Sequence, residues 1–412
     1  MITKAAILST GDELTSGKVV DTNSAFIADR LSSLGIKVTA VLKVGDDREA
    51  LLWAMREAAG LGEIIIGTGG LGPTADDLTS EVVAELLGCP LVQNEEIAVA
   101  LRSRFDARRI PWTVNNLKQA LFPQGAEILP NPVGTAPGFR VSLGQNKNLL
   151  WLSGVPQEMT AMFEQTVVPW ITAESGSAYQ TFSNAFKIYG LTESKLDELV
   201  KPVGLDPAIK LSLRAHYPDL TVRVTLTGGA EKQRQFIEAC KRIRLILGSH
   251  IYAEGDITLE ERVGQLLIGR KQTLALAESC TGGLISRRIT SIAGSSAYYL
   301  GGATSYANDV KIKLLGVRPA TLEKHGAVSQ ETALEMSRGI RERIGADFGL
   351  SVTGIAGPSG GTPEKPVGTV WISIAQAKNH EARLFQFHGD RERIIRGTSQ
   401  AALNWLRLGL LE

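Results

Sequence analysis

The sequence predicts an α/β protein of three domains, from its length, its hydrophobic patterning and the composition of its turns. At 412 residues the chain exceeds one ordinary domain, and two to four domains are expected. Short apolar runs alternate with amphipathic stretches over residues 1–169 and again over 256–412, which is typical of βαβ units. Residues 170–255 have a different mix and predict a small α+β connecting domain.

The first domain is expected to contain a mainly parallel sheet. Its strand candidates are short apolar runs at 5–9, 37–44, 63–67, 127–129, 139–143 and 149–152. Amphipathic patterns predict helices between them at 25–34, 48–59, 78–87 and 95–104. Residues 158–168 predict a closing helix, which Pro169 is expected to stop because a prolyl ring clashes with the preceding turn.

The other two domains are assigned from the same kinds of pattern. The connecting domain is expected to have strands at 185–189 and 220–226 and helices at 193–200 and 232–247. Residues 252–256 are polar and turn-rich, and they predict a linker. In the last domain, 273–277 predicts a buried strand, 284–289 the start of a helix and 391–408 a closing helix.

Composition narrows the functional classes. Hydrophobic residues make up 43% of the chain and charged residues 21%, as in globular proteins with substantial cores. The formal net charge of +1 gives no bulk attraction to nucleic acid or to a membrane surface, so neither partner is expected. The apolar part of residues 1–8 is too short for a signal peptide and no apolar run approaches 18 residues, so neither a signal peptide nor a membrane span is expected, and a cytoplasmic location is expected. Cys89, Cys240 and Cys280 are too few and too widely spaced for a disulfide framework or a zinc site.

Two loops of the first domain concentrate acids and glycines. Residues 9–14, continuing to Gly17, Asp21 and Asn23, directly follow a strand, and residues 67–79 lie between a strand and a helix. Both loops would lie at the carboxyl ends of parallel strands, where ligands of such sheets bind. Glycines let backbone N–H groups approach phosphates, and carboxylates suit a hard cation such as Mg²⁺. The combination predicts a phosphorylated ligand with a metal.

Helix capping is the alternative for Asp76 and Asp77, and for these two acids alone both interpretations have about equal weight. The chain lacks both the Walker loop and the G-x-G-x-x-G fingerprint. Two further segments could complete the cleft, one with Asn115, Lys118 and Gln119 and the other at 131–138.

The turn at 278–283, E-S-C-T-G-G, places hydroxyls, a thiol and two glycines between a strand and a helix. Backbone N–H groups at a helix N-terminus can stabilise the intermediate that a side-chain nucleophile forms. Ser279 or Thr281 could instead be a simple N-cap, which is the commoner role in an isolated segment. No histidine pattern supports a Ser-His-Asp triad, so a serine nucleophile needs another base, and lysine is the known substitute.

Lys311 is the candidate base, because a buried lysine can lose its proton near neutral pH. Tyr306, five residues earlier, could relay the proton or polarise the intermediate. The alternative that base rates favour is an exposed helix lysine. Cys280 is the competing nucleophile, but no histidine is placed to form a thiolate pair with it. Ser279 is therefore preferred.

The N-terminal motifs resemble the molybdopterin-binding-like domain, and the full set is similar to the CinA family over the whole chain. The motifs are G-D-E-L-x-x-G, G-G-L-G-P-T-x-D-D, N-P-x-G-T-A-P-G and G-V-P-x-E-M. The resemblance implies hydrolysis of the diphosphate of ADP-ribose with a divalent metal, either Mg²⁺ or a transition metal. The implied metal residues are Asp12, Glu13, Asp21, Asp76 and Asp77. The expected substrate contacts are Gly69, Gly70, Gly72, Thr74, Asn115, Lys118, Gly134 and Thr135.

The C-terminal motifs resemble the PncC-type nicotinamide-nucleotide amidase domain of the same family. They are E-S-C-T-G-G, G-S-S-A, T-S-Y-x-N-x-x-K, G-A-V-S, G-I-A-G-P-x-G-G and K-P-V-G-T. The implied reaction, which needs no cofactor, converts nicotinamide mononucleotide to nicotinate mononucleotide and ammonia. By position, Ser279 is the implied nucleophile, Lys311 the base and Tyr306 the assisting hydroxyl. The expected substrate contacts are Thr281, Gly282, Gly283, Thr353, Gly354 and Arg391, with Arg391 placed on the phosphate.

Both sites are predicted to serve pyridine-nucleotide salvage, with small nucleotides as ligands and a homodimer as the assembly. A rival of another class is a non-catalytic, competence-associated interaction protein that only binds a pterin or a nucleotide. The set Ser279, Tyr306 and Lys311 distinguishes the two, because binding alone does not require it.

Overall fold

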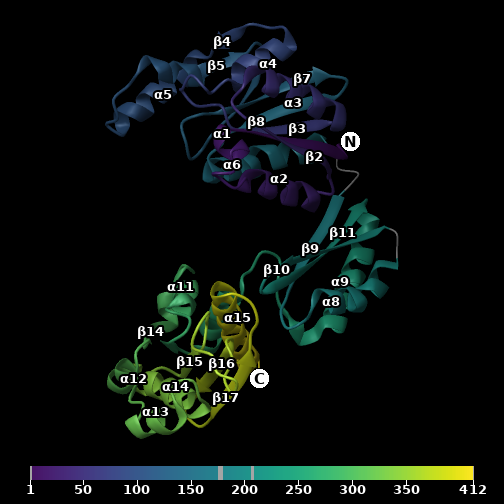
Figure 1. The fold of residues 1–412 in the computed structure, drawn as a ribbon. Helices are drawn as coiled ribbons and strands as arrows, with labels where there is room; N and C mark the ends of the chain where they lie inside the picture. Colours follow the sequence, from purple (N-terminus) through teal and green to yellow (C-terminus); the bar gives the residue numbers. More distant parts are fainter. Residues whose placement is uncertain (1, 175–179, 206–207, 412) are drawn as a thin grey trace. The chain divides into compact units, whose positions relative to one another are not determined.

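The computed structural model describes residues 2–174, 180–205 and 208–411 (Figure 1). The chain divides into two compact units, Met1–Ser183 with Thr225–Phe236 and Asn184–Val224 with Ile237–Glu412. Among the described residues, no helix is long and apolar enough to cross a membrane. The predicted α/β class is confirmed, whereas the boundaries of the three expected domains stay predictions.

The N-terminal sheet has six strands, and the first four strands in spatial order run parallel to one another. In sheet order the strands are β2 (Lys37–Val44), β1 (Lys4–Thr10), β3 (Ile64–Thr68), β8 (Lys147–Leu152), β7 (Gly138–Gly144) and β6 (Glu127–Leu129). β7 is antiparallel to both β8 and β6. Residues 5–10 of β1 are all buried, as expected for a strand that is covered on both faces.

Helices cover both faces of this sheet. On one face α2 (Thr22–Ser33), α6 (Pro156–Met162) and α7 (Val168–Glu174) pack against Ile7 and Ile66. On the other face α3 (Arg48–Leu61) and α4 (Thr79–Leu87) pack against Leu8 and Ile65. Alternate residues of one strand therefore enter opposite cores. The remaining elements are α1 (Asp12–Thr15), β4 (Leu91–Gln93), α5 (Glu95–Ala107), the 3₁₀ helix η1 (Val114–Ala120) and β5 (Leu121–Pro123).

The closing helix does not stop at Pro169, so that part of the sequence prediction is wrong. α6 continues through a π-helical turn, η2 (Phe163–Val167), directly into α7. Hydrogen bonds in a π turn span five residues, so the regular α pattern is already interrupted where the proline would clash. The proline is accommodated at the second position of α7.

Residues 180–254 supply a four-stranded sheet with its helices. In sheet order the strands are β10 (Ile209–His216), β11 (Asp219–Gly228), β9 (Gln180–Ile188) and β12 (Ile251–Glu254). The helices are α8 (Glu193–Val200), η3 (Lys201–Leu205), η4 (Ala230–Lys232), α9 (Gln233–Leu247) and η5 (Gly248–His250).

The linker predicted at 252–256 is wrong for residues 252–254. These residues belong to β12, which pairs antiparallel with β9. The Tyr252 side chain is buried, and the Glu254 carboxylate accepts hydrogen bonds from Arg244 and Asn184. Backbone pairing and these contacts stabilise an extended segment whose polar composition alone suggests a loop.

The C-terminal sheet has five strands. In sheet order they are β14 (Tyr299–Thr304), β13 (Leu274–Glu278), β15 (Phe348–Gly354), β16 (Thr369–Ala375) and β17 (His380–Gln386). The first three are parallel, and the last two are antiparallel additions. α10 (Leu259–Arg270), α11 (Leu284–Thr290) and α15 (Arg391–Gly409) pack on one face, and α12 (Asn308–Leu315) and α14 (Gln330–Ile344) on the other. The short helices η6 (Ser295–Ala297) and α13 (Pro319–His325) complete the unit.

Candidate functional site

The carboxyl ends of β14, β13 and β15 meet at one edge of the C-terminal sheet, because these strands are parallel neighbours. Residues 279–283 follow β13, and Ser305 and Tyr306 follow β14. The loop that begins at Ile355 follows β15. Polar residues from three separate parts of the chain are therefore brought to a common edge.

A lysine and a serine are in hydrogen-bond contact at this edge. The Nζ of Lys311, on α12, lies 3.1 Å from the Oγ of Ser279. The same ammonium donates to the carbonyl oxygens of Ser305 at 2.7 Å and Tyr306 at 3.2 Å. Only 1% of Lys311 is exposed, so the exposed helix lysine favoured by base rates is not what forms. The three contacts fix the amine against the hydroxyl.

Burial lowers the pKa of Lys311 from its usual 10.5. Over the described parts of the chain, no carboxylate lies within ion-pair distance of its ammonium to offset this effect. A neutral lysine amine can accept a proton from a neighbouring hydroxyl. The environment therefore moves Lys311 toward the form that a general base requires.

Cys280 lies in a different environment from Ser279. Its side chain is 5% exposed and belongs to the hydrophobic core formed with α11 and α15. Burial raises the pKa of the thiol to about 12. Because the thiolate is the reactive form of cysteine, this environment suppresses its reactivity.

Tyr306 and Arg391 form a pair beside the serine and the lysine. One terminal nitrogen of Arg391 donates to the Tyr306 hydroxyl at 2.9 Å, and the other donates to the Gly357 carbonyl at 2.6 Å. Tyr306 is 61% exposed, so its ring borders solvent. The structure thus connects Tyr306 to Lys311 through its backbone carbonyl and to Arg391 through its hydroxyl.

Glu278 holds the turn that carries Ser279, a role that the sequence did not reveal. The Glu278 carboxylate is buried at the end of β13 and accepts hydrogen bonds from the backbone N–H groups of Gly283, Ile285 and Ser286. The hydroxyls of Thr281 and Ser286 also donate to it, at 2.7 and 2.6 Å. An anion that satisfies the free donors of a helix start stabilises that start. The sequence feature that could have indicated this role of Glu278 is an acid at the end of an otherwise apolar strand.

Gly282 and Gly283 allow the chain to turn between β13 and α11. Their φ angles are +61° and +99°, in the region that favours glycine. The Gly282 N–H donates to the Ser279 carbonyl, and the Gly283 N–H donates to Glu278. Both N–H groups are therefore hydrogen-bonded within the turn. The two glycines contribute to the site through the conformation that they give to this turn.

Thr353 and Gly354 lie at the end of β15, on the same edge as Ser279. The Thr353 hydroxyl donates to the Ala327 carbonyl at 2.7 Å, and Gly354 is opposite Val370 in the sheet. Lys365 donates to the carbonyls of His325 and Val328 and so ties the loop that contains Ala327 to the loop after β15.

Replacing Glu278 with glutamine is expected to loosen the turn. One oxygen that accepts from backbone N–H groups would become an NH₂ that faces those same donors. The free energy of unfolding should fall by about 1–3 kcal/mol, as for an unsatisfied buried group. The turnover number of the amide hydrolysis proposed below should fall more than the Michaelis constant rises, because the nucleophile is displaced. Chemical denaturation and steady-state kinetics measure both.

Glu392→Gln is the matched control, because Glu392 is an exposed helix carboxylate paired with Arg396. It should change neither quantity. An unchanged turnover number in a destabilised Glu278→Gln protein would limit Glu278 to a structural role.

A cleft of about 580 Å³ opens at the carboxyl ends of the strands in the N-terminal sheet. It is the place that the acid- and glycine-rich loops predict. Of the predicted site residues, eight line this cleft, namely Glu13, Asp21, Gly69, Gly70, Gly72, Asp76, Asp77 and Thr135. Asn23 and Gln119, which the sequence placed in or beside the predicted cleft, also line it, as does Glu158 of the G-V-P-x-E-M motif. Asp46 and Ser153 line it as well and were not predicted.

The glycine loop after β3, residues 69–72, is fixed by hydrogen bonds from the residues that pack against it. The Gly69 carbonyl accepts from the Trp151 indole at 2.7 Å and from the Thr79 hydroxyl at 3.0 Å. Gly69 and Gly70 have φ angles of +98° and +65°. A side chain at Gly69 would meet the Thr10 carbonyl, so the close approach also requires glycine there.

The acids of this loop differ in their surroundings. Asp77 accepts from the Thr74 backbone N–H at 2.9 Å and from the Thr74 hydroxyl, which closes the loop. Asp76 is exposed, and a hydrogen bond from the Thr74 side chain lowers its pKa. Neither residue is the N-cap of α4, which is Leu78, so capping does not account for them.

Asp12 and Asp46 are joined by two hydrogen bonds, each from a backbone N–H to the other residue's carboxylate. The Asp12 carboxylate accepts from the Asp46 N–H, and the Asp46 carboxylate accepts from the Asp12 N–H, both at 3.1 Å. Burial, followed by the charges of Asp12 and Glu13, raises the pKa of Asp46. Asp46 therefore lines the cleft together with Glu13, whereas Asp12 does not line the cleft and instead holds Asp46 in position.

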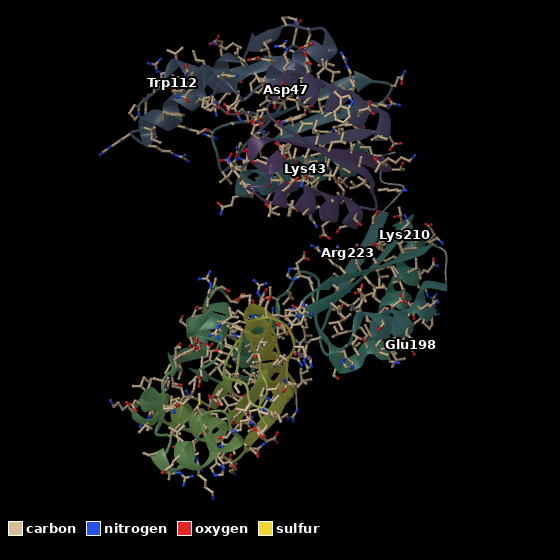
Figure 2. All side chains as sticks on the ribbon, in the orientation of Figure 1. Lys43, Asp47, Trp112, Glu198, Lys210 and Arg223 are labelled. Atoms are coloured by element: carbon tan, nitrogen blue, oxygen red, sulfur yellow. The ribbon has the colours of Figure 1, made fainter. Side chains whose placement is uncertain are left out.

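Asp21 caps α2 and is fixed by it. Burial opposes ionisation of Asp21, but hydrogen bonds from the Ser24 backbone and hydroxyl, together with the Lys43 charge, outweigh burial and lower its pKa. The Lys43 ammonium, labelled in Figure 2, lies 3.5 Å from Asp21 Oδ2. Asp21 is thus a stable carboxylate at the wall of the cleft.

The remaining predicted contacts do not line the cleft. Lys118 donates to the Thr74 carbonyl at 3.0 Å and lies 3.4 Å from Glu81. The Gly134 N–H donates to Asn131, and Asn115 is exposed on η1. Lys118 therefore supports the loop after β3 from the side.

The acids do not form a ready metal cage. Within the described ranges, no group of three or more His, Cys, Asp and Glu side chains is arranged to hold a metal ion. Mg²⁺ is commonly bound through one or two carboxylates, with phosphate and water oxygens completing the shell. The residues present fit such an ion, and they do not fit a cation held by the protein alone.

Together, these sites define a multidomain α/β protein with a buried Ser–Lys pair in one unit and an acid- and glycine-lined cleft in the other. Residues 6–173 match the family model described as "Probable molybdopterin binding domain", and residues 256–410 match the "CinA C-terminal domain". The chain belongs to the CinA family.

Similar proteins extend over the whole chain. A CinA-like protein of Geotalea daltonii is 44% identical over 413 residues, covering 99% of both chains. A CinA-like protein of Geobacter metallireducens is 43% identical over 411 residues, again covering 99% of both. Among solved structures, the competence damage-inducible protein A (ComA) of Klebsiella pneumoniae is 36% identical over 37% of this chain and 96% of its own, with a TM-score of 0.37.

Proposed function

We propose that the C-terminal unit hydrolyses the carboxamide of nicotinamide mononucleotide to nicotinate mononucleotide and ammonia. The observation that carries this proposal is the 3.1 Å contact between the buried amine of Lys311 and the Ser279 hydroxyl. Serine with a lysine base is an established variant of nucleophilic catalysis. The substrate is suggested by the similarity of the surrounding motifs to those of nicotinamide-nucleotide amidases.

The proposed reaction has two steps. Ser279 Oγ attacks the amide carbon while Lys311 Nζ takes the hydroxyl proton. The C–N bond then breaks, the proton passes from Lys311 to the leaving nitrogen, and ammonia departs from a nicotinoyl ester on Ser279. Water attacks the ester with Lys311 again as base, which releases the carboxylate and restores the serine. Glu278 keeps the attacking hydroxyl in position throughout.

Arg391 is the proposed partner of the substrate phosphate. It lies in the first turn of α15 and contacts Tyr306, whose carbonyl contacts the base. A guanidinium can bind two phosphate oxygens at once. Phosphate binding there would exchange the hydrogen bond to the Tyr306 hydroxyl for a charged contact, which frees that hydroxyl to face the amide.

Arg391→Met should raise the Michaelis constant for nicotinamide mononucleotide by at least about tenfold, the cost of one charge-assisted contact. The kinetic constants for nicotinamide riboside, which has no phosphate, should change much less. Arg396→Met, on an exposed position of the same helix, is the control and should alter neither substrate. Equal losses for both substrates in Arg391→Met would remove the phosphate contact from the proposal.

We also propose that the N-terminal cleft hydrolyses the diphosphate of ADP-ribose. The support is a cleft whose wall combines the glycine loop 69–72 with the carboxylates of Glu13, Asp21, Asp46, Asp76 and Asp77. The backbone of the glycine loop is placed to approach phosphate oxygens. A divalent metal bound between phosphate and one or two of these carboxylates would neutralise charge on the diphosphate. Asp77, by closing the loop onto Thr74, keeps the phosphate contacts in place.

Asp77→Ala should abolish metal-stimulated cleavage of ADP-ribose, because it removes both a carboxylate and the closure of the loop. Asp106→Ala, an exposed acid on α5, is the matched control and should keep full activity. Product formation is measured with added Mg²⁺ and with a chelator. Cleavage that survives both the Asp77 substitution and the chelator would contradict the metal-dependent proposal.

A protein that only binds pterins or nucleotides is the alternative. It would leave the pairing of a buried lysine with a serine at a strand end without a purpose, because binding does not need a base. Absence of ammonia release from nicotinamide mononucleotide by the intact chain would favour this alternative.

A further inference from the structure

A cavity of about 820 Å³ lies at the edge of the C-terminal sheet opposite the Ser–Lys pair. Phe348 is the first residue of β15, and Ile374 and Gln376 lie at or just after the end of β16, which is antiparallel to β15. Gly354, the last residue of β15, lies at the edge that holds Ser279. The seven residues of β15 separate the two edges by about 20 Å. The cavity is therefore distinct from the amidase site.

The walls of this cavity are largely apolar inside and polar at the opening. They come mainly from β16, β17 and the end of α15, which are neighbours in the C-terminal unit (Figure 1). Phe348 and Trp405 are 3% and 7% exposed, and Ile374 and Leu408 lie beside them in the wall. Small-molecule sites have volumes of roughly 300–1,000 Å³ and combine apolar walls with a few polar groups. The cavity has both properties.

One arginine of the cavity is held flat by an aromatic ring. The Cζ of Arg383, on β17, lies 4.4 Å from the centroid of the Trp405 ring. One terminal nitrogen of Arg383 lies 3.4 Å from Glu381 Oε2, and the Arg383 side chain is still 55% exposed. A guanidinium that stacks on an indole by one face can stack on a second flat group by its other face. Arg383 therefore offers a platform for an aromatic ring.

The charge of the lining favours an anion. Arg270, the last residue of α10, also lines the cavity, and across the residues that the structure describes no carboxylate lies within ion-pair distance of it. The charged lining residues are two arginines against one glutamate, Glu381. This excess matches a monoanion such as a carboxylate better than a phosphate, which carries close to two charges at neutral pH. A guanidinium binds a carboxylate through two hydrogen bonds.

A buried acceptor in the cavity lacks a partner. Gln272 lies between α10 and β13, and its Oε1 is buried without a hydrogen bond to any described residue. Buried polar atoms are rarely left unpaired in folded proteins. The missing partner of Gln272 Oε1 is a hydrogen-bond donor, such as a hydroxyl or an amino group.

We propose that this cavity binds a small aromatic carboxylate that also carries a hydroxyl or amino group. The carboxylate pairs with Arg270, the ring stacks on the Arg383 guanidinium, and the hydroxyl or amino group donates to Gln272 Oε1. The inference concerns an edge of the sheet that neither proposed hydrolysis uses, so it does not depend on either of them.

Equilibrium binding of three probes to full-length Ser279→Ala, which cannot turn over the amide, tests the proposal. The probes are para-hydroxybenzoate, the neutral para-hydroxybenzamide, and the ring-saturated analogue of para-hydroxybenzoate. Both altered probes should bind at least about tenfold more weakly than para-hydroxybenzoate, because one lacks the charge and the other the flat ring. Excess nicotinamide mononucleotide should not displace para-hydroxybenzoate. Displacement would place the probe in the amidase site and overturn the proposal.

Two substitutions identify the contacts. Arg270→Met should weaken para-hydroxybenzoate by at least about tenfold and change para-hydroxybenzamide by less than about twofold. Gln272→Met removes the acceptor at nearly constant size and should abolish the preference for para-hydroxybenzoate over benzoate. Arg396→Met, at an exposed position of α15 outside the cavity, is the matched control and should bind all probes as before.

Three results would overturn the proposal. The first is the absence of para-hydroxybenzoate binding at millimolar concentration, and the second is equal affinity for the three probes. The third is an unchanged affinity for para-hydroxybenzoate in Arg270→Met. Arg270 is exposed, so its substitution leaves the core intact and the variant remains a valid test.

Discussion

Ser279→Ala is expected to reduce ammonia release from nicotinamide mononucleotide by at least about a thousandfold, as in other hydrolases that lose their nucleophile. The loss follows from geometry, because the Ser279 hydroxyl is the group in contact with the buried Lys311 amine. The variant should stay folded, since the position is at a turn and the Ser279 backbone N–H bond to Val352 is kept. A coupled ammonia assay under saturating substrate measures the effect.

Cys280→Ala is the control for this experiment, because it removes the thiol that competes with Ser279 as the nucleophile. It should keep the turnover number, with at most a modest loss of stability from the small cavity. Equal rates in wild type and Ser279→Ala would remove the serine from the reaction. Activity lost only in Cys280→Ala would assign the chemistry to the thiol instead.

Lys311→Met should cause a loss of similar size, because no other described side chain hydrogen-bonds the Ser279 hydroxyl to take its proton. Methionine has nearly the same length and removes only the amine. Lys313→Met is the matched control on the same helix, at an exposed position, and should leave the rate unchanged. A Lys311→Met enzyme with wild-type turnover would exclude the lysine as the base.

The pH dependence of wild type gives a second measure of Lys311. Burial lowers its pKa below 10.5, and the neutral amine is the active form. The rate should therefore rise with pH through a midpoint below 10.5, and Lys311→Met should lose that limb of the profile.

The same shift affects stability. Between the lowered pKa and 10.5 the unfolded chain still holds the proton that the folded chain has released, so the unfolded state binds more protons. The contribution of Lys311 to the free energy of unfolding therefore rises with pH across this window. Comparing wild type with Lys311→Met by chemical denaturation at several pH values isolates that contribution.

The sequence predicted most strands and helices closely, because their apolar patterns were complete. The range 37–44 is β2 and the range 193–200 is α8, residue for residue. β10 and β12 were missed because β10 has only a half-apolar, alternating pattern, and β12 is four residues long and runs directly into the turn at Gly255. The helix end predicted at Pro169 was wrong for a related reason. The π turn before this proline depends on packing, which cannot be predicted from local helix propensity.

The candidate residues were found from the sequence more readily than their environments. Spacing alone could not tell whether Lys311 is exposed or buried, since that depends on where α12 packs. The pairing of Tyr306 with Arg391 joins two segments that are distant in sequence and needs the fold. The unpartnered oxygen of Gln272 is visible only once every other hydrogen bond is known. The glycine- and acid-rich motifs, by contrast, are short continuous segments, so the turns that they form could be predicted from the sequence alone.

The most direct test of the account is to trap the ester that it places on Ser279. Acid quenching during turnover of nicotinamide mononucleotide, followed by peptide mass analysis, should find the acyl group of the substrate on the peptide that contains Ser279. Fragmentation should assign it to the serine oxygen, and Ser279→Ala should lack it. An adduct on Cys280, or rapid-quench time points that carry no adduct while a pre-steady-state burst of ammonia appears, would contradict the account.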